Sequence, residues 1–548
     1  MVKRRPDVWQ ILSLVILAAF CLFLLWPLLC LFLSGFQGEE GQWTLENFVK
    51  FFSKRYYYQA LWNSLSVAVC VTALTLLIGI PLAYCTTFFR VRGRGVLDLL
   101  IIIAMMSPPF IGAYSWILLC GRSGWVTTFF AEHLGIDIPT VYGFRGIVLV
   151  LTLKLYPFIY IYVSGALKRM DPSLMEAAES LGIHGIRKIT SNVLPLIAPT
   201  ALSAALLVFM NALADFGTPQ LIGEGYVTMP TLIYTEFVNE MGGNASFAAA
   251  LAALMVAITA VLFLLQKFYV DRRGYNMNSM RAPAAQPVAG WRGSVLHILL
   301  YGVVLFSLIP QVTVIYTSFL NANRMVFLKG YSLNSYVLAF QTLGGAIWNT
   351  VRMGSAAIFI IVILGVAIAY LSVRRRNIIT GIIDTASMFP YIIPGSVLGI
   401  TLLLTFNKRP WLWGGTAIIM VLSLVIRRLP YTLRSSSAIL HQIPASLEEA
   451  SVSLGVSPLK SFFRITTVLM LPGVFSGAIL SWVTVINELS SSVILYSTKT
   501  RTLSVAVYSE VVRGSYGTAA ALSTILTVLT LVSLLIAFRV SGNDELHL

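Results

Sequence analysis

The chain has 548 residues, of which 57% are hydrophobic and only 11% are charged, and its mean hydropathy is +0.83. Soluble domains carry roughly 25% charged residues, so this composition excludes a soluble protein with an ordinary core. The formal net charge of +16 would suggest nucleic-acid binding in a soluble protein, but here the basic residues lie in loops between apolar blocks and no nucleic-acid partner is expected.

About twelve apolar blocks are long enough to cross a bilayer, which takes about 20 mostly apolar residues. The first block follows MVKRRPD and is too long for the hydrophobic part of a signal peptide, so we expect a retained helix in contact with membrane lipid. We predict an all-α, polytopic membrane protein. The predicted spans are residues 8–34, 60–85, 97–119, 144–167, 194–216, 245–269, 293–319, 346–371, 380–404, 414–436, 466–487 and 517–538.

Basic residues gather in alternate loops, which is the distribution expected of cytoplasmic loops. It places both termini in the cytoplasm, and an even number of spans agrees with that. The basic residues in these loops include Arg90, Arg92, Arg94, Lys168, Arg169, Arg187, Lys188, Arg272, Arg273, Arg281, Arg374, Arg375 and Arg376.

The sequence repeats itself. ALWNSLSVAV at 60–69 matches AIWNTVRMGS at 346–355, an offset of 286, and later matches such as Glu176 with Glu449 have an offset of 273. The change of offset puts about thirteen extra residues in the outer loop between the third and fourth spans of the first half. Two halves of six spans each, in the same orientation, predict a parallel repeat with a pathway between the halves.

The sequence divides at a polar linker. Residues 271–292 are rich in Arg, Pro and Gly and lie between the sixth and seventh spans. We predict a first permease-like half at 1–270 and a second at 293–548.

Each half carries a polar loop between its fourth and fifth spans. The first polar loop, near 171–195, contains LMEAAESLGIHG, and the second, near 444–468, contains LEEASVSLGVSP. Each sequence predicts a short helix with Glu in its early turns and a Gly that ends it with a positive φ. Two copies on one side of the membrane favour a docking surface over an ordinary solvated loop.

These loops resemble the EAA loop of type I ABC importer permeases, a family whose loop forms a coupling helix docking into a cytoplasmic ATPase. The second copy departs from the pattern, because Ser451 ends the triplet and Val468 stands where Pro195 does. The resemblance covers nearly the whole chain and implies a bacterial inner-membrane protein. The residues that it assigns to ATPase coupling are Glu176, Ala177, Ala178, Gly182, Glu449, Ala450 and Gly455.

The resemblance also implies the partners: two copies of a cytoplasmic ABC ATPase and an extracytoplasmic substrate-binding protein. The chain has no Gly-Lys dipeptide and therefore no G-x-x-x-x-G-K-[ST] phosphate loop. We expect no enzymatic activity and no cofactor in this chain, with ATP used by the partner subunits. The alternative class is a secondary transporter with two parallel halves, which would need ion sites and no docking loop.

Two acidic residues match across the repeat. Asp215 and Glu488 are 273 residues apart, and each ends the fifth span of its half at the outer face. They could form an outer gate or a transient cation site, since carboxylates suit hard cations, or they could pair with Lys or Arg. No metal site is assigned, because the five Cys and five His form neither a CxxC nor an HExxH pattern.

A basic group lies in the fourth span of each half. Lys154 matches Arg427, and Arg428 adjoins the latter. Charged residues at such depth should face the bundle or a wet cavity. They could attract an anionic substrate, or form internal ion pairs.

The substrate indications conflict. ADFGTPQLIG and NELSSSVILYSTKTRTLSVAVY resemble segments of ferric iron-type permeases, which favours ferric iron. The basic residues favour an anion such as a sugar phosphate or aminoethylphosphonate. The longer segment match favours ferric iron.

Overall fold

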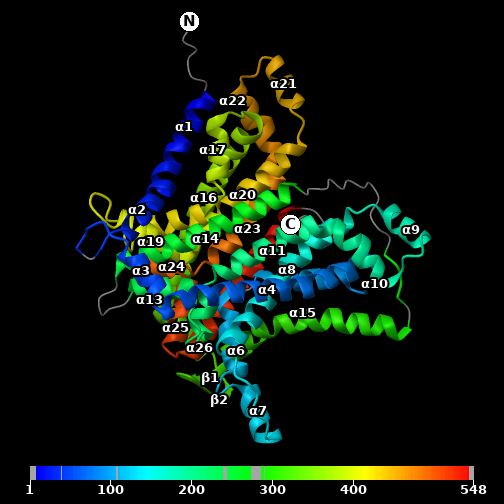
Figure 1. Cartoon of the computed structure of the whole chain (residues 1–548), viewed down its shortest axis with the longest axis vertical. Helices are drawn as coiled ribbons and strands as arrows, with labels where there is room; N and C mark the ends of the chain where they lie inside the picture. Colours follow the sequence, from blue (N-terminus) through cyan, green and yellow to red (C-terminus); the bar gives the residue numbers. More distant parts are fainter. Residues whose placement is uncertain are drawn as a thin grey trace. The chain divides into compact units, whose positions relative to one another are not determined.

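The computed structural model describes residues 8–38, 40–106, 109–238, 244–272, 285–288 and 290–541. Within these ranges the chain is mainly helical, and its one sheet is the antiparallel hairpin of β1 (Leu320–Asn323) and β2 (Val326–Tyr331) (Figure 1). Helices dominate because lipid offers no partners to backbone N–H and C=O groups, which a helix satisfies internally.

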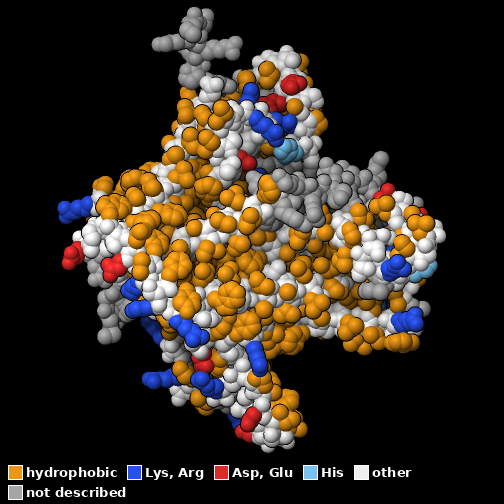
Figure 2. Space-filling view, viewed as in Figure 1, with side chains coloured by type: hydrophobic (Ala, Val, Ile, Leu, Met, Phe, Trp, Pro, Cys, Tyr) orange, Lys and Arg blue, Asp and Glu red, His pale blue; other side chains and the backbone are white. Residues whose placement is uncertain are grey.

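In the described part of the chain, nine helices are long and apolar enough to span a membrane, and two bent helix pairs raise the number to eleven. The prediction of a polytopic all-α membrane protein is confirmed, with twelve as an approximate number of spans. Hydrophobic side chains also cover most of the visible helix surface (Figure 2). Leu77, Ile298 and Phe359 are 69%, 70% and 69% exposed, as expected for side chains that face lipid.

The described chain forms two compact units. The first contains the described residues of Met1–Ser53, Ile233–Val256 and Thr317–Leu548. Besides the hairpin, its helices are α1 (Val8–Phe20), η1 (Cys21–Leu25), α2 (Trp26–Gly35), α3 (Glu46–Ser53), α16 (Asn334–Arg374), α17 (Ile378–Ala386), α18 (Phe389–Ile392), α19 (Gly395–Phe406), α20 (Ala417–Gln442), α21 (Ser446–Ser453), α22 (Pro458–Ser461), η3 (Phe462–Thr466), α23 (Thr467–Ile486), α24 (Ser492–Leu495), α25 (Leu503–Val512) and α26 (Tyr516–Ser541).

The second unit contains the described residues of Lys54–Leu232 and Ala257–Tyr316. The chain passes from one unit to the other after Ser53, within α13 (Met229–Val238) and α14 (Ala245–Arg272), and near the end of α15 (Gly290–Ser318). The other helices of the second unit are α4 (Arg55–Phe88), α5 (Arg94–Met106), α6 (Pro109–Cys120), α7 (Trp125–Leu134), α8 (Phe144–Lys168), α9 (Pro172–Ser180), α10 (Gly185–Lys188), η2 (Ile189–Val193), α11 (Leu194–Leu213), α12 (Gly217–Ile222) and α15 (Gly290–Ser318).

The first helix of each sequence half packs in the unit formed mainly by the other half. In the second unit, Ser115 donates to the carbonyl of Pro310 in α15 at 2.7 Å. In the first unit, Trp9 of α1 packs on Tyr370, with ring centroids 4.6 Å apart. The compact units therefore differ from the predicted halves, which describe the sequence repeat. Much of the predicted linker lies outside the described residues.

The order of elements recurs along the chain. The bounds of α6 and α19 differ by 286 residues, and those of η2 and η3, and of α11 and α23, differ by 273. In each half, a single π-helical turn, η2 or η3, precedes the helix of the fifth span. The first half has the additional helix α7, in the loop where the sequence predicts the extra residues.

Two predicted spans are not continuous helices, which corrects the expectation for 97–119 and 380–404. Helices covering Arg94–Met105 and Phe110–Leu134 are bent by 94°, and those covering Ile378–Tyr391 and Gly395–Phe406 are bent by 113°. In the second case the break falls at Pro394, which is extended, with ψ of 147°, and has no N–H to continue a helix.

Candidate functional site

The basic and acidic residues that the sequence singled out in the first half are partners. Lys154 lies in α8, and its Nζ is 3.3 Å from Oδ2 of Asp215, which follows α11. Both side chains are largely buried, with 21% and 7% exposed. The other carboxylate oxygen of Asp215 accepts a hydrogen bond from the backbone N–H of Thr218 at 2.9 Å. Asp215 therefore joins α8 to the start of α12.

The second half repeats this arrangement. Nη1 of Arg427 in α20 is 2.7 Å from Oε1 of Glu488, which follows α23. Glu488 also accepts a hydrogen bond from the backbone N–H of Ser491 at 3.2 Å. In both halves the paired residues are 61 positions apart, and the carboxylate caps the backbone three residues later.

One difference separates the two copies. Arg428 also binds Glu488, through Oε2, so one carboxylate faces two guanidinium groups in the second half. Glu488 is only 3% exposed and each arginine 15%. The backbone of α19 passes close to this cluster at Gly395. A Cβ added there would overlap the guanidinium of Arg427.

The ion pairs bear on the conflicting substrate indications given by the basic and the acidic residues. The sequence treats them as separate candidates for anion and cation binding, whereas the structure pairs each carboxylate with a cation from the fourth span. Burying such charges is costly unless they are paired, so the pairs hold the ends of two helices together. Within the described residues, no group of three or more His, Cys, Asp or Glu could hold a metal ion.

Four further polar residues, unassigned by the sequence analysis, anchor the segment after the fifth span. Asn63 Nδ2 donates to the carbonyl of Val227 at 2.9 Å, and Ser64 Oγ accepts from the N–H of Met229 at 2.7 Å. In the second half Asn349 and Thr350 do the same for the segment that leads into α25. The sequence signal was present, because these residues are the polar part of the repeated WNS and WNT.

Each polar loop folds as a short helix that ends at a glycine. In the first, Gly182 has φ of +75° and the N–H of Ile183 donates to the carbonyl of Ala178 at 2.9 Å. In the second, Gly455 has φ of +88° and the N–H of Val456 donates to the carbonyl of Ser451 at 3.2 Å. This is the helix ending expected from the sequence.

The two loop helices also share their exposed face. Glu176 and Ala177 of α9, and Glu449 and Ala450 of α21, are exposed. Ala178 is buried, so that side chain packs inward rather than contributing to the surface. Two residues that the sequence did not single out are the most exposed apolar groups of the loops. They are Leu181, 79% exposed, and Leu454, 85% exposed.

Comparison with known proteins identifies the family. The family described as "Binding-protein-dependent transport system inner membrane component" matches residues 75–274 and 357–541, more than half of the chain. The chain belongs to this permease family. The two matched segments contain both polar loops and both buried ion pairs.

Two relatives that match 90% or more of this chain have ferric names. The permease is 29% identical over 545 residues to the ferric transport system permease protein FbpB of Actinobacillus pleuropneumoniae, covering 98% of this chain and 78% of that protein. It is 27% identical to a putative ferric transport system permease protein, FbpB 1, of Haemophilus influenzae, covering 90% of this chain and 78% of that protein.

Two other similarities are partial. A putative 2-aminoethylphosphonate transport system permease protein, PhnU, of Salmonella typhimurium is 25% identical, covering 49% of this chain and 94% of that protein. A bacterial ABC transporter for alginate import matches 49% of this chain and 96% of its own at a TM-score of 0.40 and 19% identity, a similarity too low to bear on function. Membership of a binding-protein-dependent family sets aside the secondary transporter.

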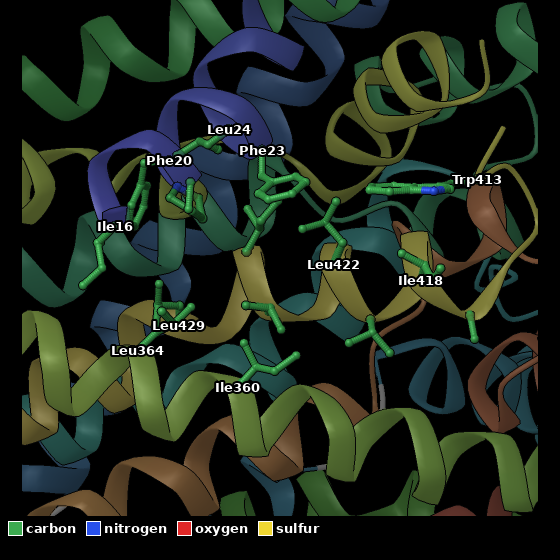
Figure 3. A pocket seen from close by; sticks show the side chains of 16 residues that line it. Ile16, Phe20, Phe23, Leu24, Ile360, Leu364, Trp413, Ile418, Leu422 and Leu429 are labelled. Carbon is green, nitrogen blue, oxygen red and sulfur yellow. The ribbon is translucent and has the colours of Figure 1, made fainter. Parts of the chain in front are cut away.

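The permease also contains an apolar cavity of about 550 Å³ in its first unit, among α1, η1, α16 and α20 (Figure 3). The side chains that line it are all apolar, and they include Phe20, Phe23, Ile360, Trp413 and Leu422. A charged substrate would lose its hydration there without gaining a polar partner. The cavity is therefore not a substrate site for an ion.

The first polar loop is expected to loosen in acid before the second does. Its Glu179 binds Lys188, which lowers the pKa of this carboxyl, and the backbone N–H of Ser173 lowers the pKa of Asp171. Such stabilisation is complete above the ordinary carboxyl pKa and is lost as the pH falls through the lowered value. The second loop has Val452, Ser461 and Pro444 at the positions of Glu179, Lys188 and Asp171.

The measurement is hydrogen exchange of the α9 and α21 peptides between about pH 6 and pH 2.5, corrected for intrinsic rates. This range begins above the ordinary carboxyl pKa and extends well below it. Protection should fall in α9 at a higher pH than in α21. Equal loss in both helices would contradict the assignment of this pH dependence to the Glu179 pair and the Asp171 cap.

Proposed function

We propose that this permease carries ferric iron across the bacterial inner membrane in an ATP-driven, binding-protein-dependent importer. Similarity over 98% of the chain to a ferric transport permease carries this proposal. The buried ion pairs remove the main objection to it. The basic residues of α8 and α20 already have carboxylate partners, so they need not imply an anionic substrate.

The polar loops are the proposed docking sites for two copies of a cytoplasmic ATPase. Glu176 and Ala177 in α9, with Glu449 and Ala450 in α21, form matched exposed surfaces. Gly182 and Gly455 end these helices and leave Leu181 and Leu454 projecting. An exposed leucine is suited to insertion into an apolar cleft on a partner.

The remaining parts of the importer follow from the same proposal. An extracytoplasmic binding protein delivers the substrate, and both termini of the permease lie in the cytoplasm with the basic loops. ATP is bound and hydrolysed by the partner subunits, and this chain needs no cofactor of its own. Asp215 and Glu488 act by holding the segments that follow α11 and α23, rather than as permanent ligands of the cargo.

An anionic organophosphate is the second candidate substrate. It is favoured by the surplus cation Arg428 in the second half, where two guanidinium groups face one carboxylate, and by the partial similarity to a putative aminoethylphosphonate permease. The extra positive charge would suit a phosphonate or phosphate ester.

Uptake into membrane vesicles that contain the permease, its ATPase and its binding protein distinguishes the two substrates. We expect ATP-dependent uptake of labelled ferric iron, and no uptake of labelled 2-aminoethylphosphonate or sugar phosphate. Vesicles with a hydrolysis-deficient ATPase are the control. Phosphonate uptake that Arg428→Met abolishes, without any ferric uptake, would replace ferric iron with the second candidate.

A further inference from the structure

The two polar loops are anchored to their surroundings in different ways. The position of Met175 in α9 is occupied by Glu448 in α21. The side chain of Glu448 is 14% exposed and points toward protein, whereas its neighbour Glu449 is exposed. The repeat does not explain why one copy has a carboxylate directed toward protein beside an exposed Glu, where the other copy has Met175.

Glu448 connects three elements of the first unit. Its Oε1 accepts a hydrogen bond from the hydroxyl of Tyr370 in α16 and lies 3.9 Å from Nη2 of Arg375, just after that helix. Its Oε2 accepts from the hydroxyl of Thr466 in η3 at 3.4 Å. Tyr370 is fully buried, and the surrounding packing restricts the position of its hydroxyl group. The carboxylate therefore ties α21 to the end of α16 and to the turn that begins the fifth span.

The N-terminal helix joins the same cluster. Trp9 of α1 is 5% exposed and packs against Tyr370 and Phe462, with ring centroids 4.6 and 5.2 Å away. The guanidinium of Arg375 lies 6.0 Å from the centroid of the Trp9 ring. Aromatic contacts of this kind add to the apolar burial and fix relative orientation. A movement of α21 thus acts on α1 and α16 together.

Among the described contacts of the first half, no side-chain hydrogen bond or ion pair corresponds to this connection. The first half keeps a tyrosine, Tyr84, but has Met175, Phe89, Ile189 and Val193 where the second half has Glu448, Arg375, Phe462 and Thr466. Met175 is buried and cannot accept a hydrogen bond as a carboxylate does. In the described part of the first loop, Glu179 forms an ion pair with Lys188 of the same loop. Glu179 also lies close enough to Tyr84 of α4 for an electrostatic interaction.

We propose that Glu448 is a positioning residue that makes the second polar loop the one rigidly coupled to the transmembrane helices α16 and α1. This rests on the proposed function, because it takes α21 to be an ATPase docking helix. Movement of the ATPase at α21 is then transmitted through Glu448 and Tyr370 to α16 and α1 together. The first loop has no matching hydrogen bond from a carboxylate to its tyrosine among the described contacts, so the two ATPase contacts are coupled to the membrane helices with unequal strength.

The test uses purified permease, reconstituted in liposomes with its ATPase and binding protein. Glu448→Met copies the residue of the first loop and should leave ATPase binding within about twofold of wild type. The number of substrate molecules transported per ATP hydrolysed should fall at least about fivefold. Fivefold is the smallest effect usual for energetic coupling between two sites. Glu448→Gln, whose amide oxygen can still accept from Tyr370, should recover most of this ratio. Met175→Leu is the matched control in the first loop and should have no effect.

Tyr370→Phe supplies an independent check. It should lower the transport ratio, and the double variant should be no worse than Glu448→Met alone, because Glu448→Met already removes the contact with Tyr370. An unchanged ratio in Glu448→Met, or additive losses in the double variant, would overturn the proposal. If wild-type permease failed to bind the ATPase at all, the docking function itself would fail, which is a different result.

Discussion

Glu488→Leu is expected to destabilise the permease more than any other single substitution in its charged sites. It leaves Arg427 and Arg428 buried without their shared carboxylate. Removing one partner of a buried pair costs about 3–5 kcal/mol, because the remaining charge has lost its compensation. Thermal unfolding of the purified protein in detergent should show a much lower midpoint, together with loss of the monodisperse fraction.

Two variants separate charge imbalance from lost packing. Asp215→Leu removes the carboxylate partner of Lys154 alone, and Lys154 is 21% exposed and has a flexible side chain. The unfolding midpoint of this variant should therefore fall less than that of Glu488→Leu. Adding Arg427→Met and Arg428→Met to Glu488→Leu should restore much of the stability, since apolar groups can replace a buried ion cluster at little cost. A Glu488→Leu protein as stable as wild type would contradict the structural role of this cluster.

Leu181→Asp combined with Leu454→Asp is expected to abolish ATPase binding while the permease stays folded. Both side chains project into solvent, so the substitutions should change the free energy of unfolding by less than about 0.5 kcal/mol each. An apolar anchor at the centre of an interface commonly contributes about 2 kcal/mol or more, so two such losses remove most of the affinity. Affinity of the detergent-purified permease for the labelled ATPase measures the effect.

Leu181→Met with Leu454→Met is the matched control, because methionine keeps an apolar side chain of similar size at each position. This variant should bind the ATPase nearly as well as wild type. Tight binding by the double Asp variant would show that α9 and α21 dock elsewhere or do not dock. The single variants report whether the two sites contribute equally.

Much of the fold was predictable because its signals are local. Apolar blocks about 20 residues long predict spanning helices, and the two matching polar loops predict two helices that end at Gly182 and Gly455. The bends within 97–119 and 380–404 were missed, although Pro394 carries part of the signal. A proline shows where a helix can break, but packing decides whether the two pieces stay collinear.

The sequence by itself determined the membrane class, the repeat and the exposed loops, since each depends on composition and spacing along the chain. Only the tertiary structure decided that Lys154 binds Asp215 and that Arg427 binds Glu488. The partners are 61 residues apart on different helices, and the sequence was equally compatible with separate ion sites. Tertiary packing also distinguished Glu448 from Glu449, adjacent residues of which one is tied to Tyr370 and the other is exposed. Neighbouring side chains on a helix point about 100° apart, so burial by the surrounding helices, not their shared chemistry, gives them different roles.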